Sequence, residues 1–197
     1  MSDQTPALDR LAAGIDGARR LVVGVGDDQW HRPTPCPDWD VRELVGHLTG
    51  GNHRFAALLE TDGPLTPPTR PSGDVLGDDP QAAFEASATA LLTAFAVPGR
   101  LAALRPSPLG SVPGETLLWL RVVEHLVHGW DLAQATGQRP EFAPGLAEQA
   151  LEFSEANLGN VQGGRTPFGS RLPAPPDAPA LDRLVALLGR RVSAEES

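Results

Sequence analysis

Apolar residues recur along most of this chain with the three-to-four-residue spacing of an amphipathic α-helix. The segments that carry such a stripe are 6–25, 41–60, 80–97, 115–136, 144–157 and 178–192. We find no segment with the two-residue alternation, bounded by hairpin turns, that is typical of a half-buried strand. The pattern therefore predicts an all-α protein, and we expect a four-helix bundle with a short C-terminal helical extension.

Local signals place the ends of several predicted helices. Asp40 stands three residues before Glu43, a variant of the capping box, so a helix is expected to begin at about residue 41. Pro80 suits a first helical turn, Gly137 suits a C-cap, and the glycine pair at 50–51 marks an irregularity or a close approach. The segments rich in Pro or Gly are expected to be loops, the second of them long and mobile: 32–38, 61–80 and 158–169.

The segment 117–133, LLWLRVVEHLVHGWDLA, is strongly apolar and yet carries a row of polar residues. At about 100° per residue, four of them share one face of the predicted helix. They are Arg121, Glu124, His128 and Asp131. Because burying an unpaired carboxylate or imidazole costs several kcal/mol, this row must face water, pair internally or bind a cation.

A metal site is one interpretation of the polar residues on this helical face. Glu124 and His128 lie one turn apart, where two side chains can hold one ion. His47 lies among the apolar positions of the segment 41–60 and is expected to point partly into the bundle. A His, Glu, His set leaves a coordination position open, as catalytic sites do. Asp131 would then be a hydrogen-bond acceptor behind the ligands or a substrate contact, and Arg121 would hold Glu124 or an anionic substrate.

Structural alternatives account for the same residues. His47 is also typical of a hydrogen-bonded core histidine, and Glu124 and His128 can pair with each other and with Arg121. A non-catalytic role for the whole bundle would fit either arrangement.

His125 is a rival ligand, because it lies three residues before His128. Its side chain is expected to point about 100° away from that of Glu124, which places it on another face. His31 and His53 are expected at the surface. The four tryptophans are expected to be core residues or pocket walls: Trp30, Trp39, Trp119 and Trp130.

Length, composition and charge narrow the classes of function. With 197 residues, 41% of them hydrophobic and 21% charged, residues 1–197 are expected to form a single domain. A net charge of −9 disfavours binding to nucleic acid or an anionic membrane. We see no apolar run of about 20 residues and no N-terminal signal core, and therefore expect a soluble, cytoplasmic protein.

The single cysteine, Cys36, excludes an internal disulfide and a multi-cysteine zinc site. It stands between Pro35 and Pro37 and is expected to be a small buried apolar residue rather than a ligand. All 16 basic residues are arginine, so Schiff-base chemistry and a P-loop lysine are excluded as well.

Three motifs together resemble a known family. They are PTPCPDWDVRELVGHL, LRVVEHLVHGWDLAQATG and LDRLVALLGR, and the likeness spans about residues 8–191. The chain resembles the actinobacterial mycothiol-dependent maleylpyruvate isomerase-like family, within the DinB-like metal-binding superfamily. This resemblance implies a DinB-type bundle with a divalent metal, usually zinc in the isomerases. By motif position the ligands would be His47, Glu124 and His128.

The resemblance also implies a chemistry. The isomerases carry a further C-terminal α/β domain, and the residues after LLGRR are too few for an equivalent. We therefore expect the metal platform, rather than maleylpyruvate isomerisation, to be retained. Its metal, zinc or alternatively nickel or iron, would bind mycothiol, lower the pKa of the thiol and present a thiolate nucleophile.

The resulting expectation is a thiol-dependent transferase or isomerase whose partners are a small thiol, an electrophilic substrate and a second copy of the chain in a homodimer. The competing hypothesis is a non-catalytic, metal-stabilised module that binds a small ligand or a partner protein. The two hypotheses separate on replacement of His128, which would abolish turnover in the first case and chiefly destabilise the fold in the second.

Overall fold

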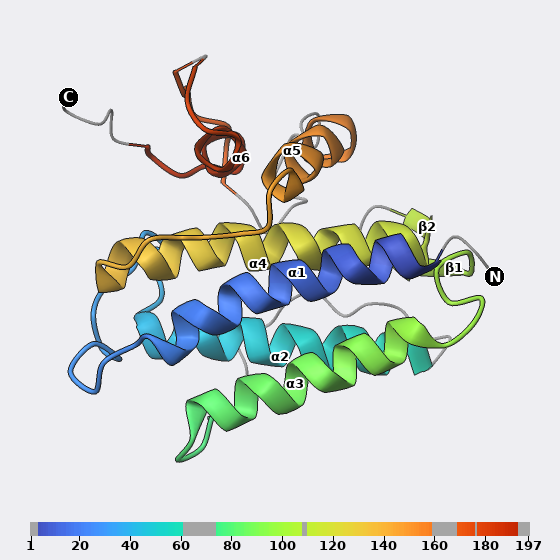
Figure 1. The fold of residues 1–197 in the computed structure, drawn as a ribbon, viewed down its shortest axis with the longest axis horizontal. Helices are drawn as coiled ribbons and strands as arrows, with labels where there is room; N and C mark the ends of the chain where they lie inside the picture. The colour runs from blue at the N-terminus through green and yellow to red at the C-terminus, as the bar shows by residue number, and fades with distance from the viewer. Residues whose placement is uncertain (1–3, 61–73, 108–109, 159–168, 176, 193–197) are drawn as a thin grey trace.

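The structure is a computed structural model that describes residues 4–60, 74–107, 110–158, 169–175 and 177–192. In this part of the chain, four long helices lie side by side, and two shorter helices pack on one side of the bundle (Figure 1). The elements are α1 (Gln4–Val23), α2 (Val41–Glu60), α3 (Pro80–Ala96), β1 (Leu104–Ser107), β2 (Gly110–Pro113), α4 (Gly114–Thr136), α5 (Leu146–Asn157) and α6 (Ala180–Leu187). The predicted fold class is confirmed.

Each bundle helix packs on two others. α1 lies against α3 and α4, and α2 lies against the same two helices. α5 and α6 pack on each other and on α4, so that they cover the face of α4 that points away from the bundle. Trp130 of α4 donates its indole N–H to Asp182 of α6 over 3.1 Å. This cover explains why α4 is apolar around most of its circumference.

The prediction of no strands is wrong in one place. The stretch between α3 and α4 contains an antiparallel hairpin in which Leu104 pairs with Pro113 and Ser107 with Gly110. Each strand has only four residues, and Leu104 is 64% exposed. Because β1 exposes the apolar Leu104 and buries the polar Arg105, the alternation that normally reveals a strand is missing there.

The helix ends follow the local signals closely. α2 begins and ends where the sequence predicted, and the capping box is present: the Glu43 amide donates to Asp40 Oδ1 over 2.8 Å, and the Asp40 amide donates to Glu43 Oε2 over 3.0 Å. Gly137 has a φ of 73° and closes α4. α6 is shorter than predicted because the chain turns at Gly189, which has a φ of 91°. Residues 61–73 of the loop expected over 61–80, and residues 159–168 of the loop expected over 158–169, lie outside the described residues.

The core lies between the four long helices. Its members are fully buried aliphatic and aromatic side chains that include Leu11, Ile15, Leu44, Leu48, Leu91, Phe95, Leu117 and Leu126. Truncating one such leucine to alanine typically costs about 2–5 kcal/mol. Among the described helices, we find none that combines the length and apolar character needed to cross a bilayer.

Candidate metal centre

His47, Glu124 and His128 come together between α2 and α4. Nε2 of His47 lies 2.9 Å from Oε2 of Glu124, and Nε2 of His128 lies 3.3 Å from the same oxygen. The three residues are 7%, 8% and 4% exposed. We call this set the candidate metal centre. The three side chains named from the sequence therefore lie together, and their binding of a metal stays a prediction.

The donor set fits a divalent cation. Two imidazole nitrogens and one carboxylate oxygen lie within 4.8 Å of one another. In a tetrahedral zinc site with bonds of about 2.0–2.2 Å, neighbouring ligand atoms stand roughly 3.4 Å apart. The two nitrogen-to-oxygen separations in the centre, 2.9 and 3.3 Å, are close to that spacing.

Behind the centre, Asp131 fixes the orientation of His128. Oδ2 of Asp131 lies 3.0 Å from Nδ1 of His128, and the Asp131 side chain is fully buried. A hydrogen bond at Nδ1 leaves Nε2 facing Glu124. This is the carboxylate–histidine pairing that commonly orients metal-bound imidazoles, and it matches the expectation that Asp131 is an acceptor behind the ligands.

Arg121 lies on the opposite side of Glu124. The Arg121 side chain is 2% exposed. Its guanidinium donates a hydrogen bond to Oδ1 of Asn52 over 2.8 Å and lies 3.8 Å from Oε2 of Glu124. A Cβ atom on Gly51 would lie 2.6 Å from its NH1 atom, so the close approach predicted at 50–51 is real. Arg121 thus holds a place beside Glu124 rather than an exposed position.

The charges in the centre depend on one another. Burial disfavours the charge on Glu124, but hydrogen bonds with His128 and His47 outweigh it and hold the pKa of Glu124 well below its ordinary value. Burial also opposes protonation of His128, yet its bonds to Asp131, Cys36 and Glu124 raise its pKa well above 6.5. For His47 burial prevails and the pKa is lowered. The arrangement favours a carboxylate beside one protonated imidazole.

His125 lies outside the centre. Its Nδ1 is 2.6 Å from the carbonyl oxygen of Arg121, one turn earlier in α4. Complete burial lowers the pKa of His125 to about 3, which makes it a neutral core histidine. His31 and His53 are exposed, as predicted.

Two further residues complete the surroundings. Trp39 stacks on the ring of His47, with centroids 4.3 Å apart, and so forms the wall expected of a tryptophan. Arg190 follows α6 and donates a hydrogen bond to Asp131. We did not identify this residue from the sequence. Fifty-nine residues separate the two in sequence, and no helical periodicity links them.

Cys36 lies near the centre without joining its donor set. Its Sγ atom is 3.3 Å from Oδ2 of Asp131 and 3.9 Å from Nδ1 of His128, the nitrogen that faces away from Glu124. The thiol is half-buried and bonded to polar groups, so the expectation of a purely apolar buried residue is wrong. Its loop turns back toward α4 and places the sulfur among polar side chains.

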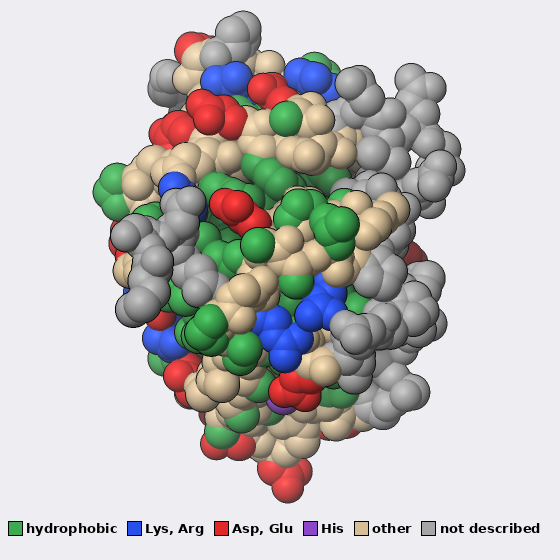
Figure 2. Space-filling model, turned by 90° about the vertical axis from the view of Figure 1, so that its right-hand side faces the viewer, with side chains coloured by type: hydrophobic (Ala, Val, Ile, Leu, Met, Phe, Trp, Pro, Cys, Tyr) green, Lys and Arg blue, Asp and Glu red, His purple; other side chains and the backbone are tan. Residues whose placement is uncertain are grey.

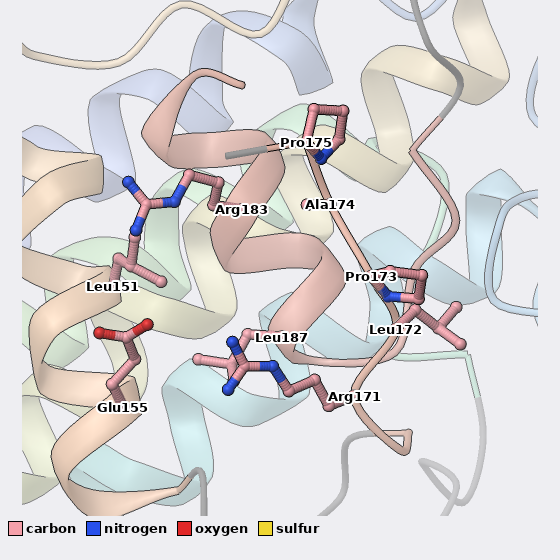
Figure 3. A pocket seen from close by; sticks show the side chains of 9 residues that line it. All are labelled: Leu151, Glu155, Arg171, Leu172, Pro173, Ala174, Pro175, Arg183 and Leu187. Carbon is pink, nitrogen blue, oxygen red and sulfur yellow. The ribbon is translucent and has the colours of Figure 1, made fainter. Parts of the chain in front are cut away.

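A separate pocket of about 300 Å³ lies between α5, α6 and residues 171–175 (Figure 3). Leu151 and Leu187 contribute apolar surface, and the polar ends of Glu155, Arg171 and Arg183 lie around it. None of the three residues of the candidate metal centre lines it. On the face drawn in Figure 2, acidic and basic side chains are mixed with apolar ones rather than gathered by sign.

The sequence is similar to a known protein family and to two proteins of Mycobacterium tuberculosis. Residues 11–133 match the family model of the mycothiol maleylpyruvate isomerase N-terminal domain. Uncharacterized protein Rv0738 of Mycobacterium tuberculosis (strain ATCC 25618 / H37Rv) is 39% identical over 178 residues, which are 90% of this chain and 93% of that protein. Uncharacterized protein Rv0036c of the same strain is 30% identical over 155 residues, 70% of this chain and 59% of that protein.

The fold is similar to a solved structure, the crystal structure of the mycothiol-dependent maleylpyruvate isomerase. The TM-score is 0.57 at 18% identity, and the likeness covers 66% of this chain. A mutant of such an isomerase gives a TM-score of 0.54 at 15% identity. The chain spans 60% of the length of the solved isomerase.

Proposed function

Because the chain belongs to the family of the mycothiol maleylpyruvate isomerase N-terminal domain, we propose that it is a divalent-metal protein that activates a low-molecular-weight thiol. His47, Glu124 and His128 hold the metal, which is zinc or alternatively nickel or iron. Mycothiol is the thiol cosubstrate, and the reaction is a transfer or isomerisation that begins with attack of the thiolate on an electrophile. Residues 1–197 act as a single domain.

One observation carries the proposal: two imidazole nitrogens and a carboxylate oxygen converge in a buried site of a family named for a thiol-dependent reaction. When bound there, a divalent cation stabilises the thiolate form of a thiol and so lowers its pKa. At neutral pH a thiol with a pKa of about 8.5 is only a few per cent ionised. Coordination of the thiol at this site would therefore increase the fraction present as thiolate by an order of magnitude or more.

The chain's own residues orient this site. Asp131 accepts a hydrogen bond at Nδ1 of His128 and leaves Nε2 free to face the ion. Trp39 restricts the ring of His47 by stacking on it. Glu124 supplies the negative charge, and Arg121 stands 3.8 Å behind it. Side chains held in this way limit the reorganisation that binding requires.

Metal analysis combined with a thiol titration tests the proposal. Protein purified without an affinity tag should contain about one divalent ion per chain, and zinc added to stripped protein should raise the Tm, since a ligand of the native state stabilises it. Mycothiol should then bind the zinc-loaded protein with release of a proton and bind the stripped protein far more weakly. Absence of metal, together with an unchanged Tm on adding zinc or nickel, would refute the central claim.

A second candidate is a non-catalytic, metal-stabilised module that binds a small ligand or a partner protein. The observation that favours it is that Glu124 already pairs with His47 and His128 inside the bundle, as in a structural polar network. His128→Ala separates the two candidates. For an enzyme it should abolish thiol-dependent turnover while most of the fold remains, whereas for a structural site it should chiefly lower the Tm.

A further inference from the structure

Arg190 reaches from the C-terminal segment to the rear of the candidate metal centre. Its NH2 atom lies 2.8 Å from Oδ2 of Asp131, and its Nε atom lies 3.2 Å from Oδ1. Two parallel bonds of this kind fix both the position and the plane of a carboxylate. The Arg190 side chain is 9% exposed and that of Asp131 is fully buried, so water screens the pair little.

The backbone turn before Arg190 fixes the position of its side chain. Gly189 has a φ of 91° and passes so close to Gly169 that a Cβ atom on Gly189 would lie 2.7 Å from the Cα atom of Gly169. The amide of Arg190 donates to the carbonyl oxygen of Val185 over 2.9 Å, and NH1 donates to that of Leu188 over 3.0 Å. The guanidinium is therefore held by a specific turn after α6.

Asp131 thus connects two distant parts of the chain. Oδ2 lies 3.0 Å from Nδ1 of His128 on α4 and 2.8 Å from Arg190 after α6. The carboxylate has little freedom to rotate without breaking one bond or the other. Its orientation in turn decides which imidazole nitrogen of His128 faces Glu124.

We propose that Arg190 is a positioning residue for the metal ligand His128, acting through Asp131, so that metal binding and docking of residues 188–192 are linked. The metal half of this statement rests on the proposed function. Linkage of two equilibria is reciprocal: docking of the segment strengthens metal binding, and metal binding strengthens docking by the same factor. Loss of a bond behind a metal ligand typically costs 10- to 100-fold in affinity.

The reactivity of Cys36 can be used to measure whether residues 188–192 are docked against Asp131. Its Sγ atom lies 3.1 Å from NH2 of Arg190 and 3.3 Å from Oδ2 of Asp131. It is the single cysteine of the chain, so a thiol reagent labels this position alone. When Arg190 leaves Asp131, the sulfur becomes more exposed, which favours reaction, but it also loses a positive charge that favours the reactive thiolate.

The first experiment compares Arg190→Gln with Arg191→Gln, a control on the next residue, which is exposed. Arg190→Gln should weaken Zn²⁺ and Co²⁺ binding roughly 10- to 100-fold and change the visible spectrum of bound Co²⁺. Arg191→Gln should change neither. Arg190→Lys keeps the charge without the two parallel bonds and should fall in between. A purely structural salt bridge would lower the Tm of the stripped protein and leave both the affinity and the cobalt spectrum as in the wild type.

The second experiment measures the rate at which iodoacetamide labels Cys36. In stripped protein Arg190→Lys, which keeps the positive charge but not the two parallel bonds, should react several-fold faster than the wild type. Zn²⁺ should slow the wild type and should leave Arg190→Gln and a His47→Ala control nearly unaffected. Equal rates in stripped wild type, Arg190→Gln and Arg190→Lys, together with equal metal affinities, would overturn the proposal.

Failure of the two proposals can be told apart. If the wild type binds no Zn²⁺ or Co²⁺, the proposed function fails and the linkage fails with it. Labelling of stripped protein then still shows whether Arg190 holds the segment against Asp131. If the wild type binds metal and the Arg190 variants bind it equally well, only the positioning role is lost. If Arg190→Gln does not fold, Arg190→Lys carries the same comparison.

Discussion

Two regions of the molecule contain groups of charged side chains: the candidate metal centre and the pocket between α5 and α6. In the centre, Glu124 is 8% exposed and contacts two imidazoles. At the pocket, the side chains of Arg171 and Arg183 are exposed, and neither side chain makes a hydrogen bond or ion pair with another described residue. A buried charge costs several kcal/mol unless its surroundings compensate it, whereas a solvated charge costs little. The charges of the centre therefore need hydrogen-bond and ion-pair partners to be stable, whereas the solvated charges of the pocket do not.

Removing a ligand should expose the largest difference between the two regions. His47→Ala should weaken Zn²⁺ binding by more than the roughly 100-fold that loss of a supporting bond causes. His53→Ala, an exposed histidine on the same helix, should leave the affinity unchanged. His125→Ala should lower the Tm because it empties a fully buried position, but it should affect metal binding little. A strong loss of affinity with His125→Ala and none with His47→Ala would show that the wrong helical face was assigned.

The centre should also be sensitive to pH. Because the pKa of His128 is raised, a proton competes with the metal at Nε2 already near neutral pH, and affinity should fall as pH decreases. The lowered pKa of His47 means that its proton competes only in more acidic solution. Zinc affinity measured from about pH 8 to pH 5 should therefore fall with a slope near one proton per metal and then steepen toward two. A flat profile would contradict ligation by these histidines.

Substitution of a glycine tests how tightly the buried charges are packed. Gly51→Ala brings a Cβ atom 2.6 Å from NH1 of Arg121, which its bond to Asn52 holds in place. We expect destabilisation of about 1–3 kcal/mol by overpacking. Gly46→Ala is the matched control on α2, because its Cβ atom meets Val75 at an ordinary 3.7 Å. It should stabilise the helix by up to about 1 kcal/mol. Chemical denaturation measures both.

The pocket should give the smallest effects. Arg171→Gln and Arg183→Gln remove exposed charges, so each should change the free energy of unfolding by less than about 0.5 kcal/mol. Zinc affinity should stay as in the wild type. A marked loss of metal binding in either variant would show that the pocket and the candidate metal centre are energetically coupled.

The same contrast explains what could be predicted from the sequence. α2 was placed at Val41–Glu60 because apolar periodicity and a capping box are local signals. Glu124 and His128 could be paired because one turn separates them, and His47 joined them because both helices turn these positions inward. Arg190 could not be found in this way, since its contact depends on a turn at Gly189 and on the packing of α6. The hairpin was missed because its strands have four residues each and because β1 exposes Leu104 and buries Arg105, the reverse of the usual pattern.

The enclosure of α4 has a consequence for motion. α1, α2, α5 and α6 all pack against this helix, so its central amides are shielded on every side. Amide hydrogens in such a helix exchange with solvent only when the whole molecule unfolds, whereas those of a short peripheral helix such as α6 exchange through local opening. Glu124 and His128 therefore stand on the part of the molecule that loses its structure last. An ion held there would leave through displacement of side chains around an intact α4, on a timescale set by those displacements rather than by unfolding.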